Sequence, residues 1–190
     1  MRCLDAKRIL DIGLGLPAAI LVTPLAAIVT AAILLTSGRP ILLTQTRVGA
    51  NEQPIRVLKF RTMGRNTPVV AKSELDALGN VYTPLGPFLR RWSLDELPQV
   101  LNVLHGEMSL VGPRPALPTQ EDLLTLRRRH TVLSLKPGLT GLAQIEGREA
   151  LTLATKVRFE ALYKRRRSIG LDLIILARTV RVLFSSRGTY

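Results

Sequence analysis

The chain has 190 residues, with 27 Lys and Arg against 14 Asp and Glu, so its formal net charge is +13. This length suits a single domain with a buried core, and we expect residues 1–190 to form one. Cys3 is the only cysteine and His105 and His130 are the only histidines, which excludes an internal disulfide and argues against a cysteine- or histidine-rich metal centre.

An uncharged apolar segment from Ile12 to Gly38 predicts insertion into a membrane. About 20 helical residues are enough to cross the hydrocarbon core of a bilayer. Pro17 and Pro24 interrupt the helix, and the hydroxyl of Thr23 is placed to bond a backbone carbonyl that proline leaves without its donor.

The path of this segment through the membrane has two interpretations. Basic residues lie both before and after it, so the positive-inside rule does not choose an orientation. One interpretation is a kinked transmembrane helix. The other is a re-entrant hairpin broken at Thr23–Pro24, whose two short legs enter one leaflet and return. The hairpin would insert residues 1–38 and leave both basic flanks, and residues 39–190, on the cytosolic side beside anionic lipid.

The rest of the chain predicts short helices and one short β-hairpin. We expect strands at 41–48 and 54–61, a poorly periodic loop at 63–80, helices at 86–91, 96–104, 119–130, 150–167 and 171–184, and turns at 106–115 and 136–141. The last helix mixes apolar and basic residues, which fits either core packing or a position at the membrane interface. The fold class is therefore α+β and helix-rich.

Two adjacent carboxylates, Asp95 and Glu96, precede a helix-forming run in a chain that is otherwise short of acid. The pattern Ser93-x-x-Glu96 also fits a capping box, in which both side chains satisfy backbone donors at a helix N-terminus. Pro98 weakens that interpretation, because a helix capped by Ser93 would need an amide donor at that position. Carboxylates among many cations are well placed to act on an anionic substrate, so Asp95 and Glu96 are candidate catalytic residues.

Basic side chains near turns and element ends form a candidate phosphate-binding set, although each also fits a solvated surface position: Lys59, Arg61, Arg90, Arg114 and Arg148. Arg114 stands between Pro113 and Pro115, which limit the backbone and favour a preorganised bidentate grip on phosphate. The basic runs at 127–129 and 164–167 are instead typical of solvated or lipid-contacting surfaces.

Several blocks together resemble the bacterial sugar transferases, the small monotopic phosphoglycosyl transferases. The blocks are Lys59-Phe-Arg-Thr-Met63, Ser93-Leu-Asp-Glu-Leu-Pro-Gln99, Asn102-Val-Leu104, Met108-Ser-Leu-Val-Gly-Pro-Arg-Pro115, Lys136-Pro-Gly-Leu-Thr-Gly141 and Gln144-x-x-Gly147-Arg148. They follow the family's order between Lys7 and Phe184. The chain resembles the catalytic core alone, without the extra transmembrane helices of the larger members.

The resemblance implies a reaction at the cytosolic face of the bacterial inner membrane. Such enzymes transfer a sugar 1-phosphate from a UDP-sugar to polyprenyl (undecaprenyl) phosphate, release UMP, require Mg²⁺ and start a polysaccharide or glycoconjugate pathway. By the same resemblance, Asp95 would be the nucleophile that forms a covalent phosphosugar intermediate. Glu96 would bind metal or handle a proton, which makes both carboxylates candidate Mg²⁺ ligands.

Other positions carry over from the family in the same way. Lys59, Arg114 and Arg148 match basic positions that hold phosphate, and Asp172 matches a further acidic position. The family's re-entrant helix breaks at the place that corresponds to Thr23–Pro24, which favours the hairpin.

The sequence departs from the family's usual residues at Pro84, Pro87, Glu149, Leu153 and Glu160, which bears on sugar specificity. A membrane-anchored basic binding or scaffold protein without catalysis is the alternative function. An aromatic content of 4% and the lack of a recognisable nucleic-acid motif argue against a nucleic-acid partner. The expected partners are a UDP-sugar, polyprenyl phosphate and membrane lipid, and self-association stays open.

Overall fold

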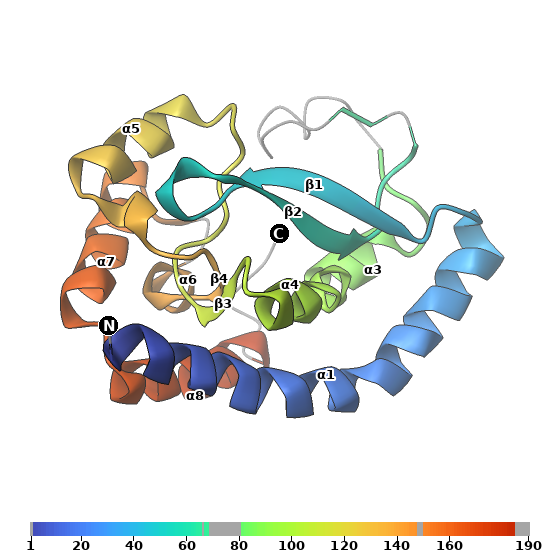
Figure 1. The fold of residues 1–190 in the computed structure, drawn as a ribbon. Helices are drawn as coiled ribbons and strands as arrows, with labels where there is room; N and C mark the ends of the chain where they lie inside the picture. Colours follow the sequence, from blue (N-terminus) through green and yellow to red (C-terminus); the bar gives the residue numbers. More distant parts are fainter. Residues whose placement is uncertain (1, 66, 69–80, 148–149, 185–190) are drawn as a thin grey trace.

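The structure, a computed structural model, describes residues 2–65, 67–68, 81–147 and 150–184 and has the expected helix-rich α+β fold (Figure 1). The helices are α1 (Arg2–Ser37), α3 (Gly86–Arg91), α4 (Gln99–His105), α5 (Glu121–Arg129), α6 (Leu142–Glu146), α7 (Leu153–Arg166) and α8 (Ile169–Phe184). Short 3₁₀ turns are η1 (Ala50–Glu52), η2 (Leu94–Glu96) and η3 (Val132–Ser134). The strands are β1 (Leu42–Val48), β2 (Pro54–Phe60), β3 (Ser109–Val111) and β4 (Gly138–Thr140).

The predicted β-hairpin is confirmed. β1 and β2 pair antiparallel, with Leu42 opposite Phe60 at the open end and Val48 opposite Pro54 at the turn. Side chains alternate across a strand, so Lys59 shares a face with the buried Val57 and is directed toward the protein rather than toward solvent. In Figure 1 the hairpin lies across the molecule from α1, with α4 between them.

α4 is tied to the hairpin by Asn102, whose side chain is 2% exposed. Its Oδ1 accepts from Leu58 N at 3.1 Å, and its Nδ2 donates to Arg56 O at 2.7 Å and to Glu107 at 2.6 Å. One amide therefore satisfies both a donor and an acceptor on the free edge of β2. The main core lies beneath this edge and includes Val57, Val103, Met108, Val111, Tyr163 and Ile175.

A small parallel sheet stands where the sequence predicts only turns. Ser109 pairs with Gly138 and Val111 with Thr140, although strands of three residues carry too little alternation to be recognised. The approach is close: a Cβ added to Gly138 would lie 2.1 Å from Gly112 N. Only glycine allows the two backbones to come this close. Their close approach fixes where the chain leaves β3 toward Arg114.

The helix α1 is assigned without interruption through Pro17 and Pro24. The predicted break is therefore a bend within one helix, which Figure 1 shows as a turn of the helix axis toward its C-terminal end, and not a separation into two returning legs. Thr23 Oγ1 donates to Ala19 O at 2.8 Å, one residue before the carbonyl that Pro24 leaves without its helical donor.

The polar residues near the start of α1 make hydrogen bonds to α4 and β3. Arg8 donates to Val103 O at 2.6 Å and to Leu104 O at 2.5 Å, where α4 ends with carbonyls that lack helical partners. Asp11 is 3% exposed and accepts from Ser109 Oγ and from the amide of Leu110. Arg8 is one of the basic residues that precede the apolar segment, and its guanidinium caps the end of α4 instead of facing lipid.

The far half of α1 packs on the same body through Val29 and Ile33, which lie against Phe60 and Leu89. Both ends of α1 therefore rest on one side of the protein, an arrangement compatible with a monotopic anchor. The opposite face is exposed and apolar and includes Ile9, Leu16, Ile20, Leu21, Ile28 and Leu35. By length and composition alone, the stretch Ala6–Ser37 meets the requirements of a membrane span.

Candidate active site

The two carboxylates of the acidic pair lie in the 3₁₀ turn η2, directly before α4. The backbone of Ser93 is left-handed, with φ 54°, and its side chain makes no capping hydrogen bond. The side chain of Glu96 is turned to cations instead of to a backbone amide. The capping-box interpretation of Ser93 and Glu96 is therefore wrong, and Pro98 becomes the N-cap position of the helix that follows.

Glu96 lies between two cations that come from distant elements. Its Oε1 is 2.8 Å from Lys59 Nζ and 2.8 Å from Arg114 Nη2, while Oε2 is 3.4 Å from Arg114 Nη1. Burial alone would raise the pKa of Glu96, but Arg114 and Lys59 outweigh it and hold that pKa well below its ordinary value. Glu96 is therefore an anion throughout the neutral range.

Asp95 is more deeply buried and less completely paired. The residue is 6% exposed, and its Oδ2 lies 3.7 Å from Lys59 Nζ. Burial raises the pKa of Asp95, Lys59 opposes the shift, and Glu96 adds to it, while Arg90 and Arg114 lower it. The net shift is upward. A carboxylate that is poorly solvated and only loosely paired is a better nucleophile than one fully engaged in hydrogen bonds.

Arg90 completes the cationic surroundings of Asp95 from α3. Its guanidinium lies 5.3 Å from the ring centroid of Tyr82, and Nη1 is 3.3 Å from the Tyr82 hydroxyl. Stacking on an aromatic face holds a guanidinium in place while leaving donors directed elsewhere. The structure thus brings Lys59, Arg90 and Arg114 together around the acidic pair.

Two other predicted site residues, Arg61 and Asp172, make their hydrogen bonds elsewhere in the described part of the chain. Arg61 is 3% exposed, and its guanidinium donates to Ser37, Gly38 and Arg39 carbonyls, where it caps the end of α1. Asp172 is fully buried and accepts from Lys7 Nζ and from the Tyr163 hydroxyl, both at 2.7 Å. Arg61 therefore fixes the C-terminal end of α1, and Asp172 fixes its N-terminal part through Lys7.

Some predicted features lie partly or wholly outside the described residues. Arg148 and the departure at Glu149 lie there, as does most of the predicted loop at 63–80. Thr23 and Pro24 are described; they are exposed positions of α1, shortly before Ala26 and Val29, which pack on the body of the protein.

Sequence reasoning missed Arg47, which stands beside Arg114. Its Nη1 donates to Pro115 O at 3.2 Å, and its Nε and Nη2 donate to Gln45 Oε1 at 3.0 and 2.5 Å. Burial, together with the nearby charge of Arg114, lowers the pKa of Arg47 to about 10, although Glu96 opposes the shift. No sequence signal distinguishes this arginine from its many exposed counterparts.

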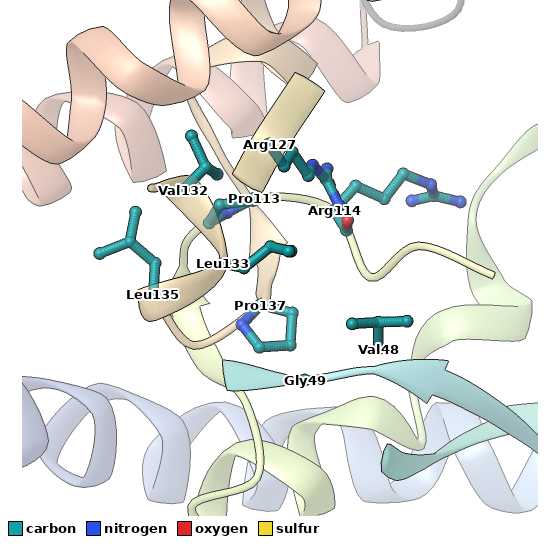
Figure 2. Close-up of a pocket in the computed structure, with 9 residues that line it drawn as sticks. All are labelled: Val48, Gly49, Pro113, Arg114, Arg127, Val132, Leu133, Leu135 and Pro137. Atoms are coloured by element: carbon teal, nitrogen blue, oxygen red, sulfur yellow. Dashed lines mark hydrogen bonds between the residues drawn. The ribbon is translucent and has the colours of Figure 1, made fainter. Parts of the chain in front are cut away.

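Sequence reasoning also misplaced Arg127, which was assigned to a solvated run. Arg127 is 2% exposed and pairs with Glu160, and its Nη2 reaches Arg114 O at 3.0 Å (Figure 2). The cavity between these residues and Leu133 has a volume of about 10 Å³, room for about one water molecule and too little for a substrate.

Whether the acidic pair can hold a divalent cation depends on the oxygen ligands that it offers. Within the described ranges no group of three His, Cys, Asp or Glu side chains could form a protein-only metal centre. Mg²⁺ does not need one, because it is commonly held by one or two carboxylates together with waters and substrate phosphate oxygens. Asp95 and Glu96 meet that requirement, which makes the pair compatible with a metal bound jointly with a diphosphate.

Comparison with known proteins identifies the family to which these site residues belong. A family model described as bacterial sugar transferase matches residues 3–186. Exopolysaccharide production protein ExoY of Sinorhizobium fredii is 36% identical over 97% of this chain and 88% of its own length, and that of Rhizobium meliloti is 37% identical with the same coverage. UDP-glucose:undecaprenyl-phosphate glucose-1-phosphate transferase of Klebsiella pneumoniae is 39% identical over 97% of this chain, which corresponds to 41% of that longer protein. The resemblance inferred from the motifs is confirmed: the chain belongs to the bacterial sugar transferase family.

Proposed function

We propose that this membrane-associated sugar transferase moves a sugar 1-phosphate from a UDP-sugar to a polyprenyl phosphate, and that Asp95 is the nucleophile. The observation that carries the proposal is the arrangement of Lys59, Arg90 and Arg114 around a buried, loosely paired Asp95. Relatives named as UDP-glucose:undecaprenyl-phosphate glucose-1-phosphate transferases support the donor and acceptor classes.

The first half-reaction forms a bond between an Asp95 carboxylate oxygen and the phosphorus that carries the sugar. The bond from that phosphorus to the bridging oxygen breaks, and UMP leaves with the electron pair. A carboxylate that approaches a diphosphate meets repulsion from the phosphoryl oxygens. The guanidinium of Arg114, the guanidinium of Arg90 and the ammonium of Lys59 reduce this repulsion by neutralising charge near the reacting phosphorus.

The second half-reaction regenerates the enzyme. An oxygen of polyprenyl phosphate attacks the same phosphorus, the Asp95–phosphorus bond breaks, and the carboxylate is restored with its electron pair. Dividing the transfer in this way lets a water-soluble donor and a lipid acceptor use one site in turn. Mg²⁺, held by Asp95, Glu96 and the diphosphate, would supply further neutralisation of phosphate charge.

Glu96 contributes by holding its two neighbours. Because its carboxylate stays ionised between Lys59 and Arg114, it fixes both cations beside Asp95 before substrate arrives. A free cation on a long side chain would lose conformational freedom on binding phosphate, and this loss is largely avoided when the side chain is already ordered.

The location we propose is the cytosolic face of the bacterial inner membrane. The exposed apolar face of α1 supports membrane association, and UDP-sugars are soluble donors that approach from the aqueous side. The acceptor phosphate would approach from the lipid side, because its polyprenyl chain stays in the bilayer.

The test is UMP release by purified protein with a panel of UDP-sugars, polyprenyl phosphate and Mg²⁺. We expect turnover with a donor, ping-pong kinetics, and a phosphosugar adduct on the peptide that contains Asp95 when acceptor is omitted. Asp95→Ala should show neither adduct nor turnover. Asp122→Asn, which neutralises an exposed carboxylate on α5, is the matched control and should keep both. Full turnover by the Asp95→Ala variant would exclude the mechanism.

A further inference from the structure

Two arginines from different elements bind consecutive carbonyls of the Pro113-Arg114-Pro115 segment. Arg127 Nη2, from α5, donates to Arg114 O at 3.0 Å, and Arg47 Nη1, from β1, donates to Pro115 O at 3.2 Å. The next residue is also held, since Val48 N donates to Ala116 O at 2.9 Å. The segment is therefore attached on both sides along its backbone.

Arg127 is itself fixed by a buried ion pair. Its Nε is 2.8 Å from Glu160 Oε2 and its Nη2 is 2.5 Å from Glu160 Oε1, so the contact is bidentate, and both side chains are 3% exposed. The planar guanidinium can bind the two carboxylate oxygens and a carbonyl at once, which an ammonium cannot do with the same geometry. Lysine is therefore not an equivalent residue at position 127.

Figure 2 shows the direction of the side chains on this segment. Arg127 points toward the backbone of Arg114, while the side chain of Arg114 is directed away from the small cavity. The guanidinium of Arg114 ends on Glu96. The backbone attachment and the cationic head thus lie at opposite ends of the same residue.

We propose that Arg127, together with Glu160, and Arg47 are positioning residues that set the place of the Arg114 guanidinium beside Asp95. The flanking prolines fix two φ angles of the segment but not its position relative to the acidic pair. The two carbonyl contacts supply that position. Small displacements of a phosphate-binding cation lower the rate steeply, because electrostatic stabilisation depends on preorganised geometry. This inference rests on the proposed transferase function.

A purely structural role for the ion pair makes a different prediction. Replacing a buried ion pair with apolar side chains of similar size is often neutral or stabilising. The double variant Arg127→Met/Glu160→Met should therefore fold, yet it has no donor for Arg114 O. If the pair only filled the core, this variant would keep its turnover rate.

The experiment compares Arg127→Lys, the Met/Met double variant and Arg47→Lys with the wild type. In steady-state UMP release we expect each to lower kcat by about tenfold, the change that corresponds to about 1.4 kcal/mol, with a smaller effect on the donor KM. Hydrogen exchange of the amides of Arg114, Ala116 and Leu117 should become faster. Arg128→Lys is the matched control, because this neighbour on α5 is exposed and its ion pairs are with Glu52 and Glu121 at the surface.

The outcomes separate the two proposals. Wild-type kcat and unchanged exchange at Arg114, Ala116 and Leu117 in the folded Met/Met double variant and in Arg47→Lys would overturn the positioning role while the transferase function stands. If the wild type released no UMP from any donor, the proposed function would fail, and the exchange rates alone would still show whether these residues fix the segment. Should Arg127→Lys not fold, Arg47→Lys tests the same segment from its other side.

Discussion

Lys59 Nζ and Glu96 Oε1 lie 2.8 Å apart, and this contact joins the inward face of the β-hairpin to the turn that carries the acidic pair. The same carboxylate oxygen binds Arg114. One acidic side chain therefore gathers two cations from elements that are otherwise separate, and Asp95, its neighbour in sequence, remains less fully paired.

Replacing Glu96 with Gln should lower both stability and turnover. The amide removes the negative charge that Lys59 and Arg114 share. We expect a loss of about 1–2 kcal/mol in the free energy of unfolding, because Lys59 keeps its longer contact with Asp95 and solvent screens the half-exposed Arg114. The pKa of Glu96 is depressed, so its contribution is present above the ordinary value of 4.5 and fades as pH falls below it. Urea unfolding at neutral pH and below 4.5 tests this. Glu52→Gln is the control, and an equal loss at both pH values would contradict the assignment.

Replacing Asp95 with Asn should abolish turnover and raise stability. The pKa of Asp95 is raised by burial, so folding favours its protonated form, and the ionised form costs stability as pH rises above the ordinary value of 3.8. The amide removes that cost at neutral pH. Thermal melts should show a higher Tm for the variant at neutral pH and a smaller difference in acid. A variant less stable than wild type at neutral pH would show that Lys59 outweighs burial.

The same shift predicts the acid limb of the activity profile. Because Asp95 acts as an anion, turnover should fall as pH drops through its pKa, at a higher pH than an ordinary aspartate would give. A log–log plot of kcat/KM against pH measures this limb in the free enzyme. The profile of Asp122→Asn should be identical, and a limb at or below 3.8 would contradict the raised pKa.

The ion pair between Lys7 and Asp172 should be essential for holding α1 against α8. It joins residues 165 apart, its Asp172 side chain is 1% exposed, and the second oxygen accepts from Tyr163. Asp172→Ala leaves the ammonium of Lys7 without its partner, and we expect a loss of about 3–5 kcal/mol. Denaturant unfolding in detergent measures it. Glu146→Gln, which breaks the more exposed ion pair with Arg178, is the control and should cost less than about 1 kcal/mol, as other surface pairs do. Similar losses of stability in both variants would contradict the prediction.

Charges on the outer face of α1 should release the protein from membranes without unfolding it. Leu21 and Ile28 are 76% and 66% exposed, so they contribute little to the core. Aspartate at the centre of a bilayer helix costs about 2.5–3.5 kcal/mol per residue. Vesicle flotation of the Leu21→Asp/Ile28→Asp variant should show reduced binding with an unchanged far-UV spectrum. Leu153→Asp on α7 is the control, and equal loss of binding there would place the membrane contact elsewhere.

Local patterns predicted a substantial part of this protein. The hairpin follows from two β-leaning runs around a turn, and α3 has the predicted bounds because Gly86 and Pro87 mark its start. The acidic pair and the Pro113-Arg114-Pro115 segment were identified from neighbouring residues alone. These features depend on contacts within a few positions, which a sequence displays directly.

Only the tertiary structure decided which charges are paired and buried. The parallel strands β3 and β4, the contact of Arg127 with Glu160 and that of Lys7 with Asp172 all join distant positions, and nothing in their local sequence differs from exposed runs. A charge is stabilised in the interior only by the partner that folding brings to it. The sequence by itself determined the long apolar segment that forms α1, the family and the candidate nucleophile Asp95. The fold decided that Arg61 and Asp172 secure α1, and that Arg47 and Arg127 hold the segment that presents Arg114.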